Sequence, residues 1–154
     1  MNIGGIDLVD LLFTFQGRIN RGKFWLGVLV YVIVNIVFGV IQYALGSLGA
    51  ILAAIAAIAV FISGIAVALK RLHDRDKSGW WLLIFYVAPV VLFIIGGVIA
   101  IAGIASDSMG GGIIGTLFYL AGAAVLIWAF VELGCLRGTA GSNQYGPDPL
   151  AGRA

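Results

Sequence analysis

The stretch ILAAIAAIAVFISGIAVALKRLHDRDKSGWW, residues 51–81, joins an apolar run to a charged segment and two tryptophans. A helix rises about 1.5 Å per residue, so the apolar part is long enough to cross a hydrocarbon core of roughly 30 Å. Lys70, Arg71, Arg75 and Lys77 then place four cations before the next apolar run begins. This order is typical of a membrane span that ends at a membrane surface.

The composition of the whole chain agrees with this interpretation. Its 154 residues are 62% hydrophobic and 10% charged, with a mean hydropathy of +1.11. A soluble domain has about 25% charged residues, so this chain does not have enough charge to coat a water-exposed globule. The one cysteine, Cys135, excludes an intrachain disulfide and a cysteine-based zinc site. Most of the surface is therefore expected to face lipid.

Four apolar runs are long enough to span a membrane, and they cover roughly residues 25–45, 48–69, 80–103 and 113–134. Lipid cannot satisfy an open backbone, and the runs show no alternating strand pattern, so we expect helices. The sequence predicts an all-α membrane protein, a four-transmembrane-helix bundle in a single integral membrane domain over 1–154.

The basic residues predict the orientation of the spans. All nine lie before the first span, between the second and third, or after the fourth: Arg18, Arg21, Lys23, Lys70, Arg71, Arg75, Lys77, Arg137 and Arg153. Connections 46–49 and 104–112 contain none. Because cytoplasmic loops are enriched in Lys and Arg, residues 1–24, 70–79 and 135–154 are predicted to be cytoplasmic, with both termini.

Aromatic residues mark the predicted membrane interface. Trp25 opens the first span, and Trp80 with Trp81 opens the third, all on the predicted cytoplasmic side, where amphipathic rings act as anchors. At 6–15, Asp7, Asp10 and Thr14 share one helical face. This segment is either a short N-terminal interfacial helix or a weakly ordered lead-in.

Three polar segments share the predicted cytoplasmic side: GRINRGKFW at 17–25, KRLHDRDKSGWW at 70–81 and GSNQYGPDP at 141–149. With these three motifs in this order, the chain resembles domain-of-unknown-function family 805, whose members are small bacterial inner-membrane proteins with four helices. The resemblance covers 17–149 and implies a multi-pass protein of the bacterial plasma (inner) membrane. It brings no catalytic residue, cofactor or substrate with it.

The polar segments predict a candidate cytoplasmic cluster, which is either structural or anion-binding. Its members are Arg18, Arg21, Arg71, His73, Asp74, Asn143, Tyr145 and Asp148. We favour a structural closure, in which the YGPDP turn folds back and Asp148 pairs with an arginine. Alternatively, the charges form a surface ion-pair network, or the cations bind anionic phospholipid headgroups, the latter set being Arg18, Arg21, Lys70, Arg71, Arg75 and Lys77.

Function is predicted less sharply than topology. No metal, cofactor or catalytic residue is assigned, because His73, Asp74, Asp76 and Asp148 make only a weak metal motif. The leading hypothesis is a non-enzymatic regulator or assembly partner that acts through its cytoplasmic face. The alternatives are a small transporter or channel, which the few deep polar groups disfavour, and an enzyme or binding module for an anionic lipid headgroup. Expected partners are the bilayer, a membrane protein or a second copy, but no nucleic acid.

Overall fold

The computed structural model describes residues 2–3 and 6–151. Within these ranges, four helices are long and apolar enough to cross a membrane. They are built from α2 (Arg21–Leu45), α3 (Ser47–Asp74), the π-helical turn η1 (Leu83–Val87) with α4 (Ala88–Ala105), and α5 (Met109–Phe130) with the π-helical turn η2 (Val131–Cys135). The prediction of an all-α protein with four such helices is confirmed.

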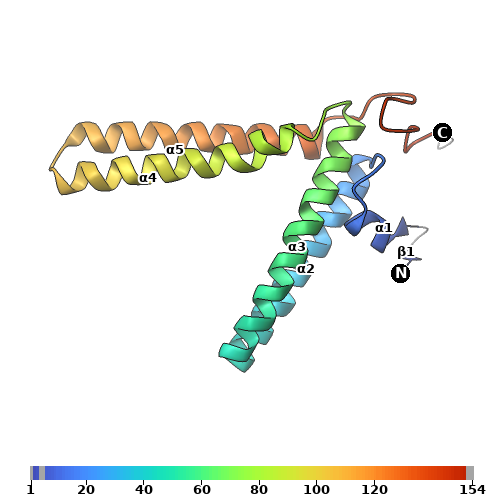
Figure 1. Cartoon of the computed structure of the whole chain (residues 1–154), viewed down its shortest axis with the longest axis horizontal. Coiled ribbons are helices and arrows are strands. Elements are labelled where there is room, and N and C mark those ends of the chain that lie inside the picture. Colours follow the sequence, from blue (N-terminus) through green and yellow to red (C-terminus); the bar gives the residue numbers. More distant parts are fainter. Residues whose placement is uncertain (1, 4–5, 152–154) are drawn as a thin grey trace. The chain divides into compact units, whose positions relative to one another are not determined.

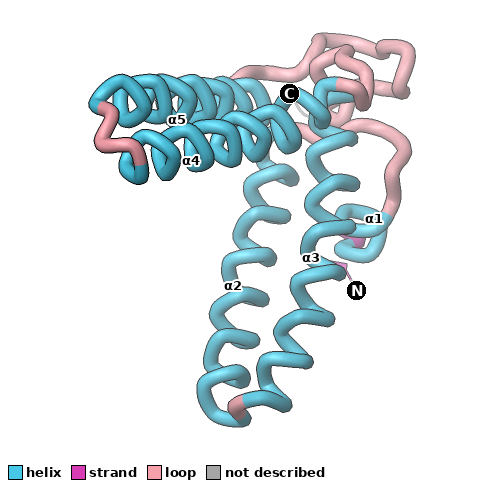
Figure 2. The backbone as a smooth tube through the Cα atoms, turned by 60° about the vertical axis from the view of Figure 1, so that its left-hand side comes forward, coloured by secondary structure: helices cyan, strands magenta, loops and turns pink. Residues whose placement is uncertain are grey.

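Contacts along the chain divide it into two compact units. The first contains the residues up to Ser78 together with those from Leu136 onward, and the second is Gly79–Cys135. Helices α2 and α3 lie side by side in the first unit, and α4 and α5 do so in the second (Figures 1 and 2). Every residue of the candidate site belongs to the first unit.

Helix α3 continues to Asp74, past the end predicted at residue 69. The charged residues KRLHD therefore belong to the last turns of the helix and not to a loop. They remain helical because their charges are satisfied there: Lys70, Arg71 and Asp74 are each buried and hydrogen-bonded. Helix α2 likewise starts earlier than predicted, because the Asn20 side chain accepts a hydrogen bond of 2.9 Å from the Lys23 amide and caps its first turn.

The α2–α3 hairpin turns within one residue. Gly46 connects the helices with φ of 56°, a backbone angle that glycine adopts without strain. A Cβ at Gly49 would lie 2.5 Å from the Ile41 carbonyl oxygen, so the two backbones approach closely at this end. Farther along, the Tyr31 and Ser63 hydroxyls are 3.0 Å apart and join the two helices by a hydrogen bond. The residues LGSLG at 45–49 thus form a tight turn.

The N-terminal segment packs against the opposite end of α3. Strands β1 (Asn2–Ile3) and β2 (Ile6–Asp7) pair antiparallel, and helix α1 (Leu8–Phe13) follows them. Leu11 forms a small buried core with Ile19 and Val67. The Lys70 ammonium donates to the carbonyls of Asp10 and Leu11 at 2.6 and 2.7 Å and so caps the C-terminal end of α1.

Glycines bring α4 and α5 into close contact. A Cβ at Gly115 would lie 2.8 Å from the Gly96 carbonyl oxygen, and one at Gly111 would lie 2.5 Å from the Gly103 Cα. Small residues drive helix association in lipid because they allow the backbones to approach. The close packing of α4 against α5 therefore depends on glycine at these positions, because a side chain would overlap the backbone of the other helix.

The start of the third apolar helix is a π-helical turn. Pro89 has no amide hydrogen and its ring would clash with a carbonyl of the preceding α-helical turn. The chain accommodates this residue through η1, in which the Ala88 amide donates to the Leu83 carbonyl, five residues back. The helix is therefore locally opened on the N-terminal side of Pro89.

We predict that Gly115→Val separates α4 from α5, since its side chain would overlap the Gly96 carbonyl and Ala100. Overpacking of this kind costs about 1–3 kcal/mol and should lower the thermal unfolding midpoint in detergent. Gly112→Val is the matched control, because nothing lies within 4 Å of a Cβ at that position. Equal midpoints for the two variants would contradict the close packing.

Candidate functional site

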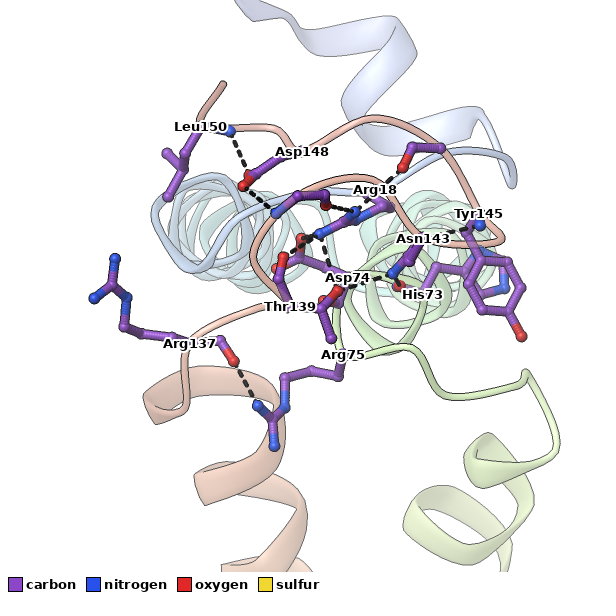
Figure 3. Close-up of polar contacts among 12 residues, drawn as sticks. Arg18, His73, Asp74, Arg75, Arg137, Thr139, Asn143, Tyr145, Asp148 and Leu150 are labelled. Carbon is purple, nitrogen blue, oxygen red and sulfur yellow. Dashed lines mark hydrogen bonds and ion pairs between the residues drawn. The ribbon is translucent and has the colours of Figure 1, made fainter. Parts of the chain in front are cut away.

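The candidate site is the place where three polar segments meet at the C-terminal end of α3. Arg18 comes from the segment between α1 and α2, and Arg71 and Asp74 come from the last turns of α3. Residues 136–151, called the tail below, follow the last helix and return to the same end of α3. Figure 3 shows Arg18 between Asp74 and the tail.

Asp74 is the centre of this arrangement and is 3% exposed. Its Oδ1 accepts hydrogen bonds from Arg18 Nε at 3.2 Å and from Arg18 Nη2 at 3.1 Å. Its Oδ2 accepts one from Arg71 Nη1. A buried carboxylate is tolerated when it is paired and its lone pairs are used, and both conditions hold here. Arg18, Arg71 and Asp74 are called the arginine–aspartate cluster below.

The two arginines use their other donors to hold the tail. Arg18 Nη1 donates to the carbonyls of Gly141 at 2.7 Å and Gly146 at 3.2 Å, and its Nη2 donates to the Thr139 carbonyl at 2.7 Å. Arg71 Nη2 donates to the Leu136 carbonyl. A guanidinium offers five donors in a fixed plane, so each arginine joins a carboxylate to several backbone carbonyls.

The tail in turn caps the end of α3. The Asp74 carbonyl accepts from the Thr139 amide at 2.8 Å and from its hydroxyl at 3.1 Å. The His73 carbonyl accepts from Asn143 Nδ2 at 2.8 Å. These are carbonyls of the last helical turn, which lack partners within the helix. Tail and helix therefore satisfy each other's backbone groups.

His73 and Tyr145 form a second contact between α3 and the tail. Their rings are parallel to within 3°, with centroids 3.9 Å apart. His73 Nδ1 lies 3.3 Å from the Gly17 carbonyl oxygen, so the imidazole also touches the segment that carries Arg18. Asn143 Oδ1 accepts from the Tyr145 amide at 2.9 Å and shapes the turn that presents the ring.

Asp148 and Arg21 lie beside the cluster. The Asp148 carboxylate accepts from the backbone amides of Leu150 at 2.9 Å and Gly141 at 3.0 Å. These bonds, together with the charges of Arg18 and Arg137, lower the pKa of Asp148. Among the described contacts Asp148 forms no ion pair within 4 Å, whereas the sequence suggested that it would pair with an arginine. Arg21 begins α2 and lines a neighbouring pocket.

That pocket has a volume of about 590 Å³ and lies between the start of α2 and the tail. Its lining includes Arg21, Arg137, Asp148 and Leu150. Arg137 and Leu150 are exposed at its edge, where Figure 3 shows them on the same side of Asp74 as Asp148. The pocket therefore lies directly beside the candidate cluster, since Asp74 and Thr139 also line it.

The structure thus brings together six of the eight predicted site residues in direct contacts and places the other two, Arg21 and Asp148, beside them. Sequence reasoning missed Thr139 and Gly138. Thr139 supplies an amide and a hydroxyl to Asp74, and a Cβ at Gly138 would lie 2.0 Å from Asp74 Oδ2. The only pattern that pointed to them was the small-residue run GTAG at 138–141.

The contacts at this site are better suited to holding the three segments together than to catalysis. The Asp74 carboxylate is fully engaged by guanidinium groups, so it is not poised as a general base. Among the residues that the structure describes, no group of three or more His, Cys, Asp or Glu is placed to hold a metal ion. Asp76 lies apart from Asp74 and accepts from Gln144 Nε2 at 3.2 Å.

Comparison with known proteins agrees with the membrane architecture. The family model described as protein of unknown function (DUF805) matches residues 12–147. The inner membrane proteins YhaI and YhaH of Escherichia coli (strain K12) are each 32% identical to the chain, over 138 and 139 residues. The aligned regions cover 90% and 88% of this chain and 87% and 86% of those proteins.

A third relative, YiiR of the same organism, is 32% identical over 138 residues, which are 89% of this chain and 86% of YiiR. No solved structure matches the chain. The family match extends from α1 into the YGPDP turn and so reaches all three segments that build the site, although it ends one residue before Asp148. With a family match over most of its length, inner-membrane homologues, and four described helices long and apolar enough to cross a membrane, this chain belongs to the DUF805 family.

Proposed function

We propose that this chain is a non-enzymatic inner-membrane protein that acts through its cytoplasmic face, as a regulator or as an assembly partner of another membrane protein. The observation that carries the proposal is the state of Asp74, whose two carboxylate oxygens bind arginines of the same chain. Throughout the described residues, every buried side-chain nitrogen or oxygen has a hydrogen-bond partner. The arginine–aspartate cluster holds the tail against α3 and so fixes the surface that the tail presents. In this role the cluster is called the latch below.

The proposed orientation places both termini in the cytoplasm. The confinement of all nine cations to three segments supports it. So does the attachment of Arg18 and the tail to one end of α3, since the turn at Gly46 lies at the other end of the hairpin. A loop with no Lys or Arg at 104–112 is then periplasmic.

Helix α1 and the tryptophans are proposed to lie at the membrane interface. Val9 and Phe13 of α1 are 57% and 49% exposed, which supports contact with the boundary between headgroups and acyl chains. Trp25 and Trp80 are exposed as well, while Trp81 packs against Trp128 in the second unit at 5.5 Å. Trp25 and Trp80 are therefore the more effective anchors.

Attraction to anionic headgroups remains part of the proposal, but with fewer residues than the sequence suggested. Arg18, Lys70 and Arg71 are buried and bind protein groups. Arg21 is exposed, and Arg75 and Lys77 are half-buried, so these three side chains stay accessible to headgroups in addition to the contacts that they make within the protein. Each cation near an anionic leaflet contributes about 1 kcal/mol, so the attraction is general and modest.

The transporter alternative rests on a groove between α2 and α3. The groove measures about 400 Å³ and is lined by apolar residues with the amides of Asn35 and Gln42. Its lining includes no charged residue, and an ion pathway usually needs ionisable groups at depth. Ala53 and Ala57 also line it, which better supports packing of another helix, from a partner or from a second copy.

The orientation predicts the accessibility of single cysteines. In a Cys135→Ser background, Ser142→Cys should react with a membrane-impermeant maleimide only after the cytoplasmic side is opened. Ser47→Cys and Ser108→Cys should react in intact spheroplasts, because they lie in the proposed periplasmic connections. Labelling of Ser142→Cys in intact spheroplasts would overturn the orientation.

The latch predicts that Asp74→Asn leaves two buried guanidinium groups without their counter-charge. Removing one partner of a buried ion pair lowers the free energy of unfolding by about 3–5 kcal/mol. We expect a lower thermal midpoint and faster tryptic cleavage after Arg137. Asp76→Asn is the matched control, since Asp76 is exposed and its φ of 56° suits asparagine. Similar behaviour of the two variants would refute the latch.

The functional proposal predicts a partner at the tail. A photo-crosslinking residue at Ser142 should give a discrete protein adduct in membranes, and one at Ser108 should not give the same adduct. Thr139→Ala removes the hydrogen bonds of this hydroxyl to the Asp74 carbonyl, Arg18 and Asn143, and should weaken the adduct in proportion to tail cleavage, at unchanged expression. Absence of any adduct at Ser142, or an adduct insensitive to release of the tail, would argue against a role of the tail surface.

A further inference from the structure

Helix α2 carries two carboxamide side chains on one face of a segment long and apolar enough to span a membrane. Asn35 and Gln42 are two helical turns apart, so they lie on the same side of the helix. Asn35 precedes the end of α2 at Leu45 by ten residues, which places it about 15 Å into the span at 1.5 Å per residue. Both side chains line the groove of about 400 Å³ between α2 and α3. The groove therefore presents hydrogen-bonding groups at membrane depth.

Most of the hydrogen-bonding capacity of these two amides is unused. Asn35 Nδ2 donates to the Tyr31 carbonyl of its own helix at 2.8 Å. Among the contacts of the described residues, neither Asn35 Oδ1 nor the Gln42 side chain has a hydrogen-bond partner. Both residues are exposed, and in hydrocarbon no water is present to bond an exposed amide, which is unfavourable. The groove thus favours an occupant that offers both donors and acceptors.

A carboxamide is complementary to a second carboxamide. Each has an oxygen that accepts and a nitrogen that donates, so two of them can form a reciprocal pair of hydrogen bonds. Of the four segments long and apolar enough to span a membrane, α2 alone contains Asn or Gln. In a dimer whose two-fold axis runs along the membrane normal, every residue lies at the same depth as its copy. Asn35 would then meet Asn35 of the second copy.

The walls of the groove allow a second helix to approach closely. Gly39 lies between the two amides on α2, and Ala53 and Ala57 face the groove from α3. Nothing lies within 4 Å of a Cβ built at Gly39, so the backbone is uncovered there. Helices associate in lipid through small residues that let backbones approach and through polar side chains that bond across the interface. The groove supplies both features.

We infer that α2 and the α2–α3 groove form the interface of a parallel homodimer in the membrane, with Asn35 paired to Asn35 of the second copy. A second copy is favoured over a different membrane protein because the unpaired amides are self-complementary. It is favoured over lipid because acyl chains offer the amides no hydrogen bond. The inference concerns the membrane-spanning part, so it goes beyond the function proposed for the tail and does not depend on it.

Disulfide crosslinking of the full chain in native membranes tests which face of α2 is at the interface. In a Cys135→Ser background, Gly39→Cys should form a dimer on oxidation with copper phenanthroline, because the two-fold axis brings this position next to its copy. Val40→Cys is the matched control, since Val40 lies about 100° farther around the helix and does not line the groove. A Gly39→Cys dimer that is absent, or no faster to form than that of Val40→Cys, would overturn the inference.

The dissociation constant of the dimer tests the role of Asn35. It is measured in lipid vesicles by fluorescence energy transfer between copies labelled at Ser142→Cys, over a range of protein-to-lipid ratios. Asn35→Leu should raise this constant by about tenfold or more, because it removes the reciprocal hydrogen bonds, and Asn35→Gln should largely keep the dimer. Equal constants for the original chain and Asn35→Leu, or a chain that is monomeric at every ratio, would overturn the inference.

Two further measurements separate dimerisation from other roles of these residues. Thr116→Val is a control for the loss of a polar group from a span, since the Thr116 hydroxyl already donates to the Gly112 carbonyl at 2.9 Å, and it should leave the dissociation constant unchanged. The thermal midpoint of Asn35→Leu should equal that of the original chain at ratios where both are monomeric. A lower midpoint there would assign Asn35 to the stability of the single chain. A Gly39→Cys adduct to a different protein, without the dimer, would replace the second copy by that protein. Either result would overturn the inference.

Discussion

The burial of Asp74 between two arginines is the constraint on which the first unit of this protein depends. The carboxylate stands at the end of α3, almost out of reach of solvent, and its two oxygens face guanidinium groups from different segments. The cluster holds one carboxylate and two guanidinium groups, so it has a net positive charge that Asp74 alone does not neutralise. The carbonyls of Leu136, Thr139, Gly141 and Gly146 supply the remaining negative ends of dipoles. Since these carbonyls belong to the tail, neutralising the cluster and ordering the tail are one event.

The sequence predicts the part of the fold that the hydrocarbon core of a membrane requires. Four long apolar runs have to be helices, and the described residues form four helices that are long and apolar enough to cross a membrane. The sequence misplaced the end of α3, because a local pattern treats KRLHD as a polar break. Lys70 is helical and buried only because α1 places two carbonyls and a hydroxyl around its ammonium. No property of residues 70–74 alone contains that information, since the partners lie more than fifty positions away.

The sequence predicted the members of the site that contribute a polar side chain. It did not predict those whose contacts are made largely by the backbone. Arg18, Arg71, Asp74 and Asn143 stood out as polar residues in an apolar chain, and the structure brings them together. Thr139 and Gly138 did not stand out, because Thr139 is a single small polar residue that contributes its amide and its hydroxyl, and Gly138 contributes only the absence of a side chain. Asp148 was expected to form an ion pair with an arginine. Its carboxylate instead meets two amides at short range, which satisfy it without a long-range partner.

The same geometry ties the latch to the pocket. Arg137 and Asp148 lie on the tail, and the tail is positioned by Arg18, Arg71 and Asp74, whereas Arg21 stands on α2. A ligand that bridges α2 and the tail therefore has its full set of contacts only while the latch is closed. By linkage, such a ligand stabilises the closed state by the difference in its affinity for the two states. Any molecule that bound across this pocket would thus hold the tail surface in place, and a partner bound to that surface would raise the affinity for that molecule by the same factor.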